Sequence, residues 1–275
     1  MTDGSNDEEL IRGAARRLVA ARRLVAFTGA GVSKESGIAT FRDADDGLWT
    51  RYDAMDMATR EGYLRDPEYV WGWYEHRFGL VADAAPNPGH LALAAMERLV
   101  PELVVVTQNI DGLHARAGST DVVELHGSIA RFRCLSGQHA ERSPDGRPVL
   151  YTREELAGLP DPTARPPRCP HCGGLIRPDV VWFGELLDEA VIDRAFDLAR
   201  ACDAMLVAGT SGVVQPAASL PILARRAGAF IVDVNPEEDE VAALADVFLR
   251  GPSGDVLPRL LAAMEEEAAQ SGLPI

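Results

Sequence analysis

A glycine-rich loop directly after an apolar run constrains the fold of this 275-residue chain more than any other feature. Residues 24–28 have the composition of a buried strand, and glycines follow at positions 29, 31 and 37. Closely spaced glycines at a strand end let backbone N–H groups approach a pyrophosphate, because side chains there would block the approach. The third glycine comes six residues after the second, so the spacing departs from the common dinucleotide fingerprint. The loop predicts dinucleotide binding, with a plain turn as the alternative.

Two further apolar runs end in polar residues. Residues 103–106 lead into Thr107, Gln108, Asn109, Ile110 and Asp111, and residues 122–125 lead into a His-Gly pair. Short apolar runs of this kind are typical of buried parallel strands. Polar groups at the carboxyl ends of such strands line a site, so we expect these segments to lie beside the glycine loop.

The chain alternates strands and helices, which predicts an α/β fold. We expect a Rossmann-like parallel sheet with helices on both faces, formed by residues 1–45, 87–127 and 178–275. Residues 46–86 are rich in Trp, Tyr and Met without a clean strand, which predicts a helical insert. Residues 128–177 hold three of the four cysteines and a run of prolines, which indicates a small inserted zinc-ribbon-like module.

The overall charge narrows the choice of partners. A net charge of −15 argues against nucleic acid and against anionic membrane surfaces, and it favours a basic peptide as partner. The first residues are acidic and lack a targeting pattern, and no apolar run reaches the length of a membrane span. We therefore expect a cytoplasmic monomer with reduced cysteines.

Together, these motifs closely resemble those of the sirtuin family of NAD-dependent protein deacylases. The resemblance continues through residues 177–185, 209–211, 214–217, 234–235 and 257–258, and covers about residues 10 to 262. It implies that an acylated lysine attacks the ribose of NAD, with release of nicotinamide and formation of O-acyl-ADP-ribose. The partners implied are acylated lysine side chains of proteins or peptides.

The resemblance also assigns roles to individual residues. It makes His126 the general base, a role that suits an imidazole with a pKa near neutrality, and it places Asn109 and Asp111 beside the nicotinamide and ribose. It places Val180, Trp182 and Phe183 against the substrate, where residues 180–183 pair with the peptide backbone. The residues implied to bind NAD are Gly29, Ala30, Gly31, Ser33, Phe41, Arg42, Trp49, Gln108, Asn109, Ile110, Asp111, Gly209, Thr210, Ser211, Asn235, Pro236, Glu237 and Ser253.

Tyr74 and Arg77 bear on which acyl group is removed. They stand three residues apart, so a helix would present both on one face. The segment resembles that of the desuccinylase and demalonylase branch, class III, which implies contact of a tyrosine hydroxyl and a guanidinium with a distal carboxylate. The alternative is a surface pair of Arg77 with Glu75 or Asp83 beside a packed tyrosine.

The cysteines leave the presence of a metal open. Cys169 and Cys172 form a Cys-x-x-Cys knuckle typical of zinc sites. The family has a second such pair, but here Cys134 is followed at the matching position by Gly137. One alternative is zinc held by Cys134, Cys169 and Cys172, with either His139 or another group as the fourth ligand. The other is that the metal has been lost and the module is stabilised by its prolines and apolar contacts.

We interpret the chain as an NAD-dependent protein-lysine deacylase with a preference for succinyl or malonyl groups. The alternatives are a plain deacetylase, an ADP-ribosyltransferase or NAD glycohydrolase, and a non-catalytic NAD-binding module. The presence of His126 and Asn109 favours deacylation.

Overall fold

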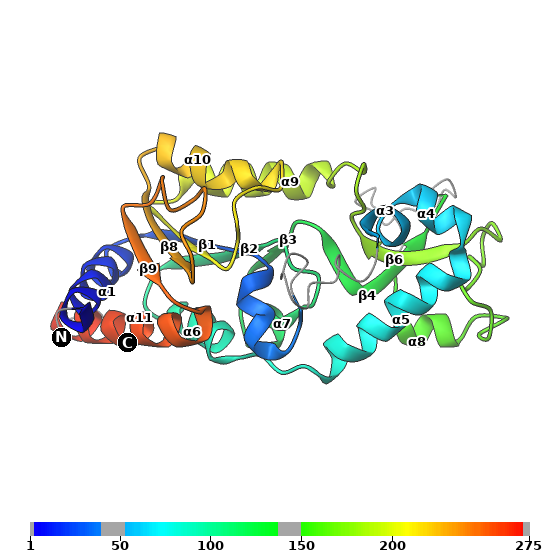
Figure 1. The fold of residues 1–275 in the computed structure, drawn as a ribbon, viewed down its shortest axis with the longest axis horizontal. Coiled ribbons are helices and arrows are strands. Elements are labelled where there is room, and N and C mark those ends of the chain that lie inside the picture. Colours follow the sequence, from blue (N-terminus) through cyan, green and yellow to red (C-terminus); the bar gives the residue numbers. More distant parts are fainter. Residues whose placement is uncertain (1–2, 40–52, 137–149, 272–275) are drawn as a thin grey trace.

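The chain folds into two lobes joined at the edge of a large sheet (Figure 1). The computed structural model describes residues 3–39, 53–136 and 150–271. In the large lobe all strand pairs are parallel, in the order β3-β2-β1-β7-β8-β9. The strands are β1 (Arg23–Thr28), β2 (Glu102–Thr107), β3 (Val122–Glu124), β7 (Ala204–Ala208), β8 (Phe230–Asn235) and β9 (Val247–Arg250). The predicted α/β class is confirmed, and β9 is a strand that the sequence pattern did not indicate.

Helices cover both faces of this sheet (Figure 1). Side chains alternate across a strand, so Leu24 and Ala26 belong to one apolar core and Val25 and Phe27 to another. The first core is covered by α1 (Asp3–Val19), α6 (Pro88–Met96) and α11 (Ser253–Gln270). The second is covered by α9 (Glu189–Ala201) and α10 (Leu220–Arg226). The strands are therefore buried on both sides, which explains their continuous apolar sequences.

The small lobe combines the two segments that interrupt the Rossmann-like pattern. Its helices are α3 (Ala54–Met57), α4 (Arg60–Arg65), α5 (Pro67–Asp83) and α8 (Arg153–Ala157). Its antiparallel sheet has the order β5-β4-β6, formed by β5 (Leu150–Tyr151), β4 (Gly127–Cys134) and β6 (Ile176–Val180). One apolar core joins helices and sheet, with Trp71 of α5 stacked against Phe132 of β4 at 5.6 Å between ring centroids.

Three short elements follow the carboxyl ends of strands in the large sheet. They are η1 (Ala30–Ser36), which follows β1, α7 (Leu113–Arg116), which follows β2, and η2 (Ala217–Ser219), which follows β7.

The chain crosses between the lobes from β3 to β4 through Leu125 and His126. Gly127 is required at this crossing, because its φ is +76° and a Cβ there would lie 2.0 Å from the carbonyl oxygen of Asp179. Among the described helices, none is long and apolar enough to cross a membrane.

Candidate active site

The motif residues of the large lobe gather at the carboxyl edge of its sheet. Gly29, Ala30, Gly31 and Ser33 follow β1, residues 108–111 follow β2, and His126 follows β3. Gly209, Thr210 and Ser211 follow β7, Asn235 ends β8 with Pro236 and Glu237 after it, and Ser253 begins α11. Phe41, Arg42, Trp49 and His139 lie outside the described residues.

The glycines after β1 and β7 allow two turns to touch. The N–H of Gly31 donates to the carbonyl oxygen of Gly209 at 2.8 Å. A Cβ on Gly31 would lie 2.7 Å from the Cα of Gly209, and one on Gly29 would lie 2.8 Å from its carbonyl oxygen. Gly209 itself has a φ of +62°. The glycine spacing is therefore required by contact between two chain turns, in addition to any approach to a phosphate.

A hydrogen-bond network holds Ser33, Asn109 and Asp111 together. The Ser33 hydroxyl donates to Oδ2 of Asp111 at 2.8 Å and accepts from Nδ2 of Asn109 at 3.1 Å. The same Asn109 amide donates to the carbonyl oxygen of Gly29 at 3.1 Å, and Oδ1 of Asp111 accepts from the N–H of Leu113 at 2.9 Å. Two segments that are distant in sequence therefore share one fixed polar cluster.

Two buried histidines support this cluster, and sequence reasoning gave them no role. Nδ1 of His90 accepts from the N–H of Asn87 at 3.3 Å, which leaves Nε2–H to donate to Ser33 at 3.4 Å. Nε2 of His114 lies 2.9 Å from the hydroxyl of Thr28. The ring centroids of His90 and His114 are 4.8 Å apart. The available signal was the order Asn-Pro-x-His, which forms a capping box at the start of α6.

Burial keeps both of these histidines neutral. It lowers the pKa of His90 to about 4 and that of His114 to about 3. The neighbouring His90 lowers the pKa of His114 further toward this value. A neutral imidazole presents one donor and one acceptor, which is the pattern that His90 uses toward Ser33 and Asn87.

His126 lies at the crossing between the lobes. Its Nδ1 is 2.9 Å from the carbonyl oxygen of Gln108, which can only accept, so Nδ1 carries the proton. Nε2 is thereby left as the basic nitrogen. Burial lowers the pKa of this imidazole, while the bond to Gln108 acts in the opposite direction. The His126 carbonyl oxygen also accepts from the N–H of Val181, which ties the histidine to the segment after β6.

Tyr74 and Arg77 are both buried on α5. The Tyr74 hydroxyl accepts a hydrogen bond of 2.8 Å from Nε1 of Trp182. Burial lowers the pKa of Arg77, whereas the charges of Tyr74 and Asp111 raise it. The surface-pair reading fails, because Arg77 is 6% exposed and Glu75 instead pairs with Arg165 at 3.3 Å. The charge of Asp111 favours the protonated guanidinium, so Arg77 of α5 is coupled electrostatically to the polar cluster.

The expected substrate segment borders the small sheet. Val180 ends β6, an edge strand of that sheet as described, and pairs with Gly127 next to His126. Trp182 is buried, with the guanidinium carbon of Arg177 3.2 Å from its ring centroid, whereas Phe183 is 50% exposed. An edge strand with an exposed aromatic beside it can accept an extended peptide.

Three cysteine sulfurs converge in the small lobe. The sulfurs of Cys134, Cys169 and Cys172 lie within 4.8 Å of one another, and those of Cys134 and Cys172 are 3.6 Å apart. Tetrahedral zinc with Zn–S bonds of about 2.3 Å separates its sulfurs by about 3.8 Å, so this set fits zinc. Ser136 also approaches, with its hydroxyl 3.1 Å from the sulfur of Cys134.

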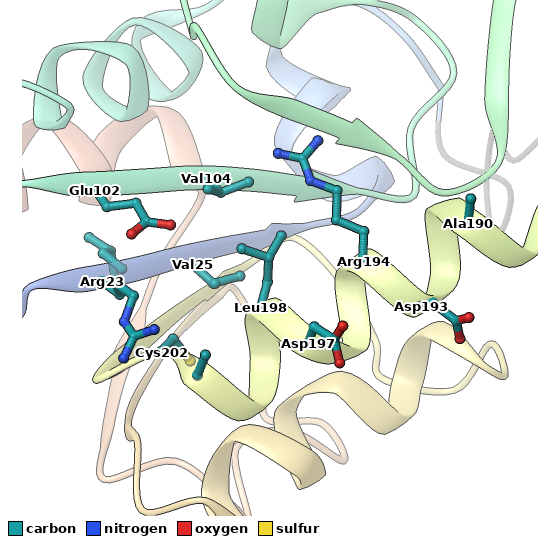
Figure 2. Close-up of a pocket in the computed structure, with 12 residues that line it drawn as sticks. Arg23, Val25, Glu102, Val104, Ala190, Asp193, Arg194, Asp197, Leu198 and Cys202 are labelled. Atoms are coloured by element: carbon teal, nitrogen blue, oxygen red, sulfur yellow. The ribbon is translucent and has the colours of Figure 1, made fainter. Parts of the chain in front are cut away.

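A separate pocket of about 490 Å³ lies at the opposite end of the strands (Figure 2). Arg23 and Glu102, the first residues of β1 and β2, line it together with α9. Among its charged residues, Arg194 is paired with Asp121 at 2.6 Å. The pocket contains none of the motif residues, so the candidate active site is the carboxyl edge rather than this pocket.

Comparison with known proteins identifies the class. Residues 29–216 match the model of the Sir2 family, so the chain belongs to the Sir2 family, the sirtuins. "NAD-dependent protein deacylase 1" of Pseudomonas aeruginosa is 50% identical over 251 residues, which cover 91% of this chain and 98% of that protein. "NAD-dependent protein deacylase" of Thermococcus kodakarensis is 46% identical over 258 residues, with 94% and 96% covered.

A solved structure agrees with this assignment. The crystal structure of a Sir2 homologue–NAD complex matches with a TM-score of 0.80 at 41% identity, covering 92% of this chain and 93% of that one. Family membership, fold and the names of the relatives together support NAD-dependent protein deacylase activity, as the sequence motifs had implied.

Proposed function

We propose that this protein removes acidic acyl groups, succinyl or malonyl, from lysine side chains in an NAD-dependent reaction. The observation that carries the acyl preference is the buried Tyr74–Arg77 pair, whose guanidinium interacts electrostatically with Asp111 in the polar cluster. A guanidinium and a tyrosine hydroxyl on the same buried face of α5 match the charge and the hydrogen-bonding groups of an acidic acyl chain, whereas an acetyl group has no carboxylate to meet them.

The carboxyl edge of the large sheet would hold NAD. The turns after β1 and β7 would lie against the phosphates, where their glycines allow a close approach. Asn235 at the end of β8 and Ser253 at the start of α11 would lie beside the adenosine. Asn109 and Asp111 would hold the nicotinamide and its ribose. NAD supplies the ribose carbon that accepts the acyl group as nicotinamide leaves.

His126 would act as general base on a ribose hydroxyl. Its Nδ1–H is fixed by Gln108, so Nε2 is oriented and unprotonated at neutral pH. The edge strand β6 would align the peptide beside it, and the acyl-lysine would enter between His126 and α5.

Arg77 and Tyr74 would bind the distal carboxylate of the acyl group. Trp182 donates to the Tyr74 oxygen, so the Tyr74 O–H is free to donate in turn. A guanidinium donates two parallel bonds to a carboxylate, and charge-assisted bonds of this kind contribute about 1.5–3 kcal/mol. An acetyl group has no distal carboxylate and therefore cannot make this contact with Arg77 and Tyr74.

The test is selectivity in Arg77→Met and Tyr74→Phe. Arg77→Met should lower kcat/KM for a succinyl-lysine peptide about ten- to hundredfold and leave acetyl-lysine activity unchanged or higher. Tyr74→Phe should have a smaller effect in the same direction. Arg65→Met, an exposed arginine of α4, is the matched control and should leave both activities unchanged. Equal loss on both substrates in Arg77→Met would reject the assignment.

A further inference from the structure

Asp233 is a buried carboxylate that the proposed reaction does not use. It lies on β8, two residues before Asn235, and is 0% exposed. Its side chain points to the same face of the sheet as Ile231, into the apolar core beneath α9 and α10. One of its oxygens, Oδ2, is buried without a hydrogen-bond partner among the described residues.

The other oxygen of Asp233 holds the amide of Asn235. Nδ2 of Asn235 donates to Oδ1 of Asp233 at 2.9 Å, and also lies 3.1 Å from Oδ2 of Asp239 and 3.2 Å from the carbonyl oxygen of Thr210. All three partners are acceptors, so the nitrogen must face them and the Asn235 carboxamide oxygen must point elsewhere. Asp239 is itself fixed, because its Oδ1 accepts from the N–H of Val241 at 2.8 Å.

The cost of burying Asp233 indicates that it serves more than packing. Burial, together with the nearby charge of Asp239, raises its pKa to about 7. An apolar side chain of the same shape would suit the surrounding core better than a carboxylate with an unpartnered oxygen. The feature that an apolar residue cannot supply is the acceptor for Asn235.

We propose that Asp233 is a positioning residue that holds the Asn235 carboxamide with its oxygen toward the adenosine ribose of NAD. This inference rests on the proposed function, which places NAD at the carboxyl edge of the sheet. Asp233 acts only through Asn235. It therefore affects binding of NAD and not binding of the acyl peptide.

Isosteric variants separate this role from a structural one. Asp233→Leu removes the acceptor and adds an apolar group to an apolar core, so thermal stability should be unchanged or higher while the Kd for NAD rises roughly five- to tenfold. Asp233→Asn keeps one acceptor oxygen but buries a donor, so its stability should fall while its Kd for NAD stays within about twofold of wild type. Calorimetry without acyl peptide gives the Kd, and thermal unfolding gives the stability.

The background of Asn235→Ala supplies the control. That variant should itself raise the Kd for NAD, and adding Asp233→Leu to it should cause no further rise in that Kd. If Asn235→Ala leaves NAD binding unchanged, the proposed placement of NAD at this edge fails. If Asn235→Ala weakens binding but Asp233→Leu alone does not, or if the two effects add, the positioning role of Asp233 is overturned.

Discussion

The hydrogen bond from His126 to Gln108 sets the tautomer of the proposed base. Substituting His126 with Ala should leave NAD binding intact and reduce turnover at least about a hundredfold, the usual scale for a general base. Calorimetry with NAD and steady-state turnover measure the two quantities. Turnover close to wild type would remove His126 from the mechanism.

The lowered pKa of His126 also sets the pH range of activity. A base acts in its unprotonated form, and burial lowers the pKa of this imidazole below the ordinary value near 6.5. The acid limb of the kcat/KM profile, which reports the free enzyme, should therefore lie below pH 6.5. A limb above that pH would contradict the assignment of a buried neutral imidazole.

The buried histidines predict a pH dependence of stability. The pKa of His114 is about 3 in the folded chain, whereas an unperturbed histidine has a pKa of about 6.5, so below pH 6.5 the unfolded chain binds a proton that the folded chain excludes. Stability is thus fully present above pH 6.5 and falls as the pH decreases toward 3. Urea unfolding between pH 7.5 and 5 should show a shallower fall in His114→Gln than in wild type, by on the order of 1–3 kcal/mol.

The exposed His76 provides the control for that measurement. His76→Gln should keep the wild-type pH dependence. The opposing contribution of Asp233, whose pKa is raised to about 7, is present in all three proteins and cancels in the comparison. An identical pH dependence in His114→Gln and wild type would contradict the buried neutral state of His114.

At this scale the sequence predicted the residues but not their partners. His126, Asn109 and Asp111 could be selected because each follows an apolar run that reads as a strand. His90 and His114 sit in helices and become supports of Ser33 and Thr28 only through tertiary contact. Periodicity within one segment carries no information on such contacts.

At the scale of elements, the turns after β1 and β7 predict a steric result. Gly31→Ala should destabilise the protein by about 1–3 kcal/mol, because its Cβ would meet the backbone of Gly209 at 2.7 Å. Gly72→Ala, in α5 with nothing within 4 Å of the added Cβ, should instead stabilise by up to about 1 kcal/mol. Chemical denaturation measures both, and equal effects of the two substitutions would contradict the close contact.

The cysteine cluster predicts metal content. Protein purified without added zinc should contain about one zinc per chain by elemental analysis, and His139→Ala should lower that content. His171→Ala, which alters the histidine inside the Cys-x-x-Cys knuckle, is the matched control and should retain zinc. Zinc-free wild-type protein would show that the metal has been lost, and full occupancy in His139→Ala would exclude His139 as a necessary ligand.

Element types were predictable where the sequence has long apolar runs or caps. Helix α5 begins at Pro67 after the Asp66 cap, and α6 begins at Pro88 after the Asn87 cap. Strand β9 was missed because it is short: of its four residues only Leu249 is buried, and the last is the exposed Arg250. Its pairing with β8 fixes it in the sheet, and that pairing is a long-range contact.

At the scale of the whole molecule, the sequence indicated two interruptions of one parallel fold. The structure packs both into a single lobe, since α4 and α5 share an apolar core with β4 and β6. Composition alone could not show that the two segments pack together, because it does not specify which apolar side chains contact one another. The arrangement packs α5, which carries Tyr74 and Arg77, against β4, and β4 begins directly after His126.

In the proposed reaction the acyl peptide supplies the nucleophile. The proposed nucleophile is the acyl oxygen, so nicotinamide leaves only when an acylated lysine is bound. A glycohydrolase would transfer the ribose to water and needs no peptide. The two activities therefore differ in whether NAD loss depends on peptide.

The most direct test is mass spectrometry of nicotinamide and acyl-ADP-ribose formed from NAD with succinyl-lysine, acetyl-lysine and unmodified peptides of one sequence. We predict release of nicotinamide with the acylated peptides only, about ten- to a hundredfold faster with succinyl-lysine than with acetyl-lysine. Equal loss of NAD with and without an acylated peptide would contradict the deacylase mechanism, and equal rates for the two acyl groups would contradict the acidic preference.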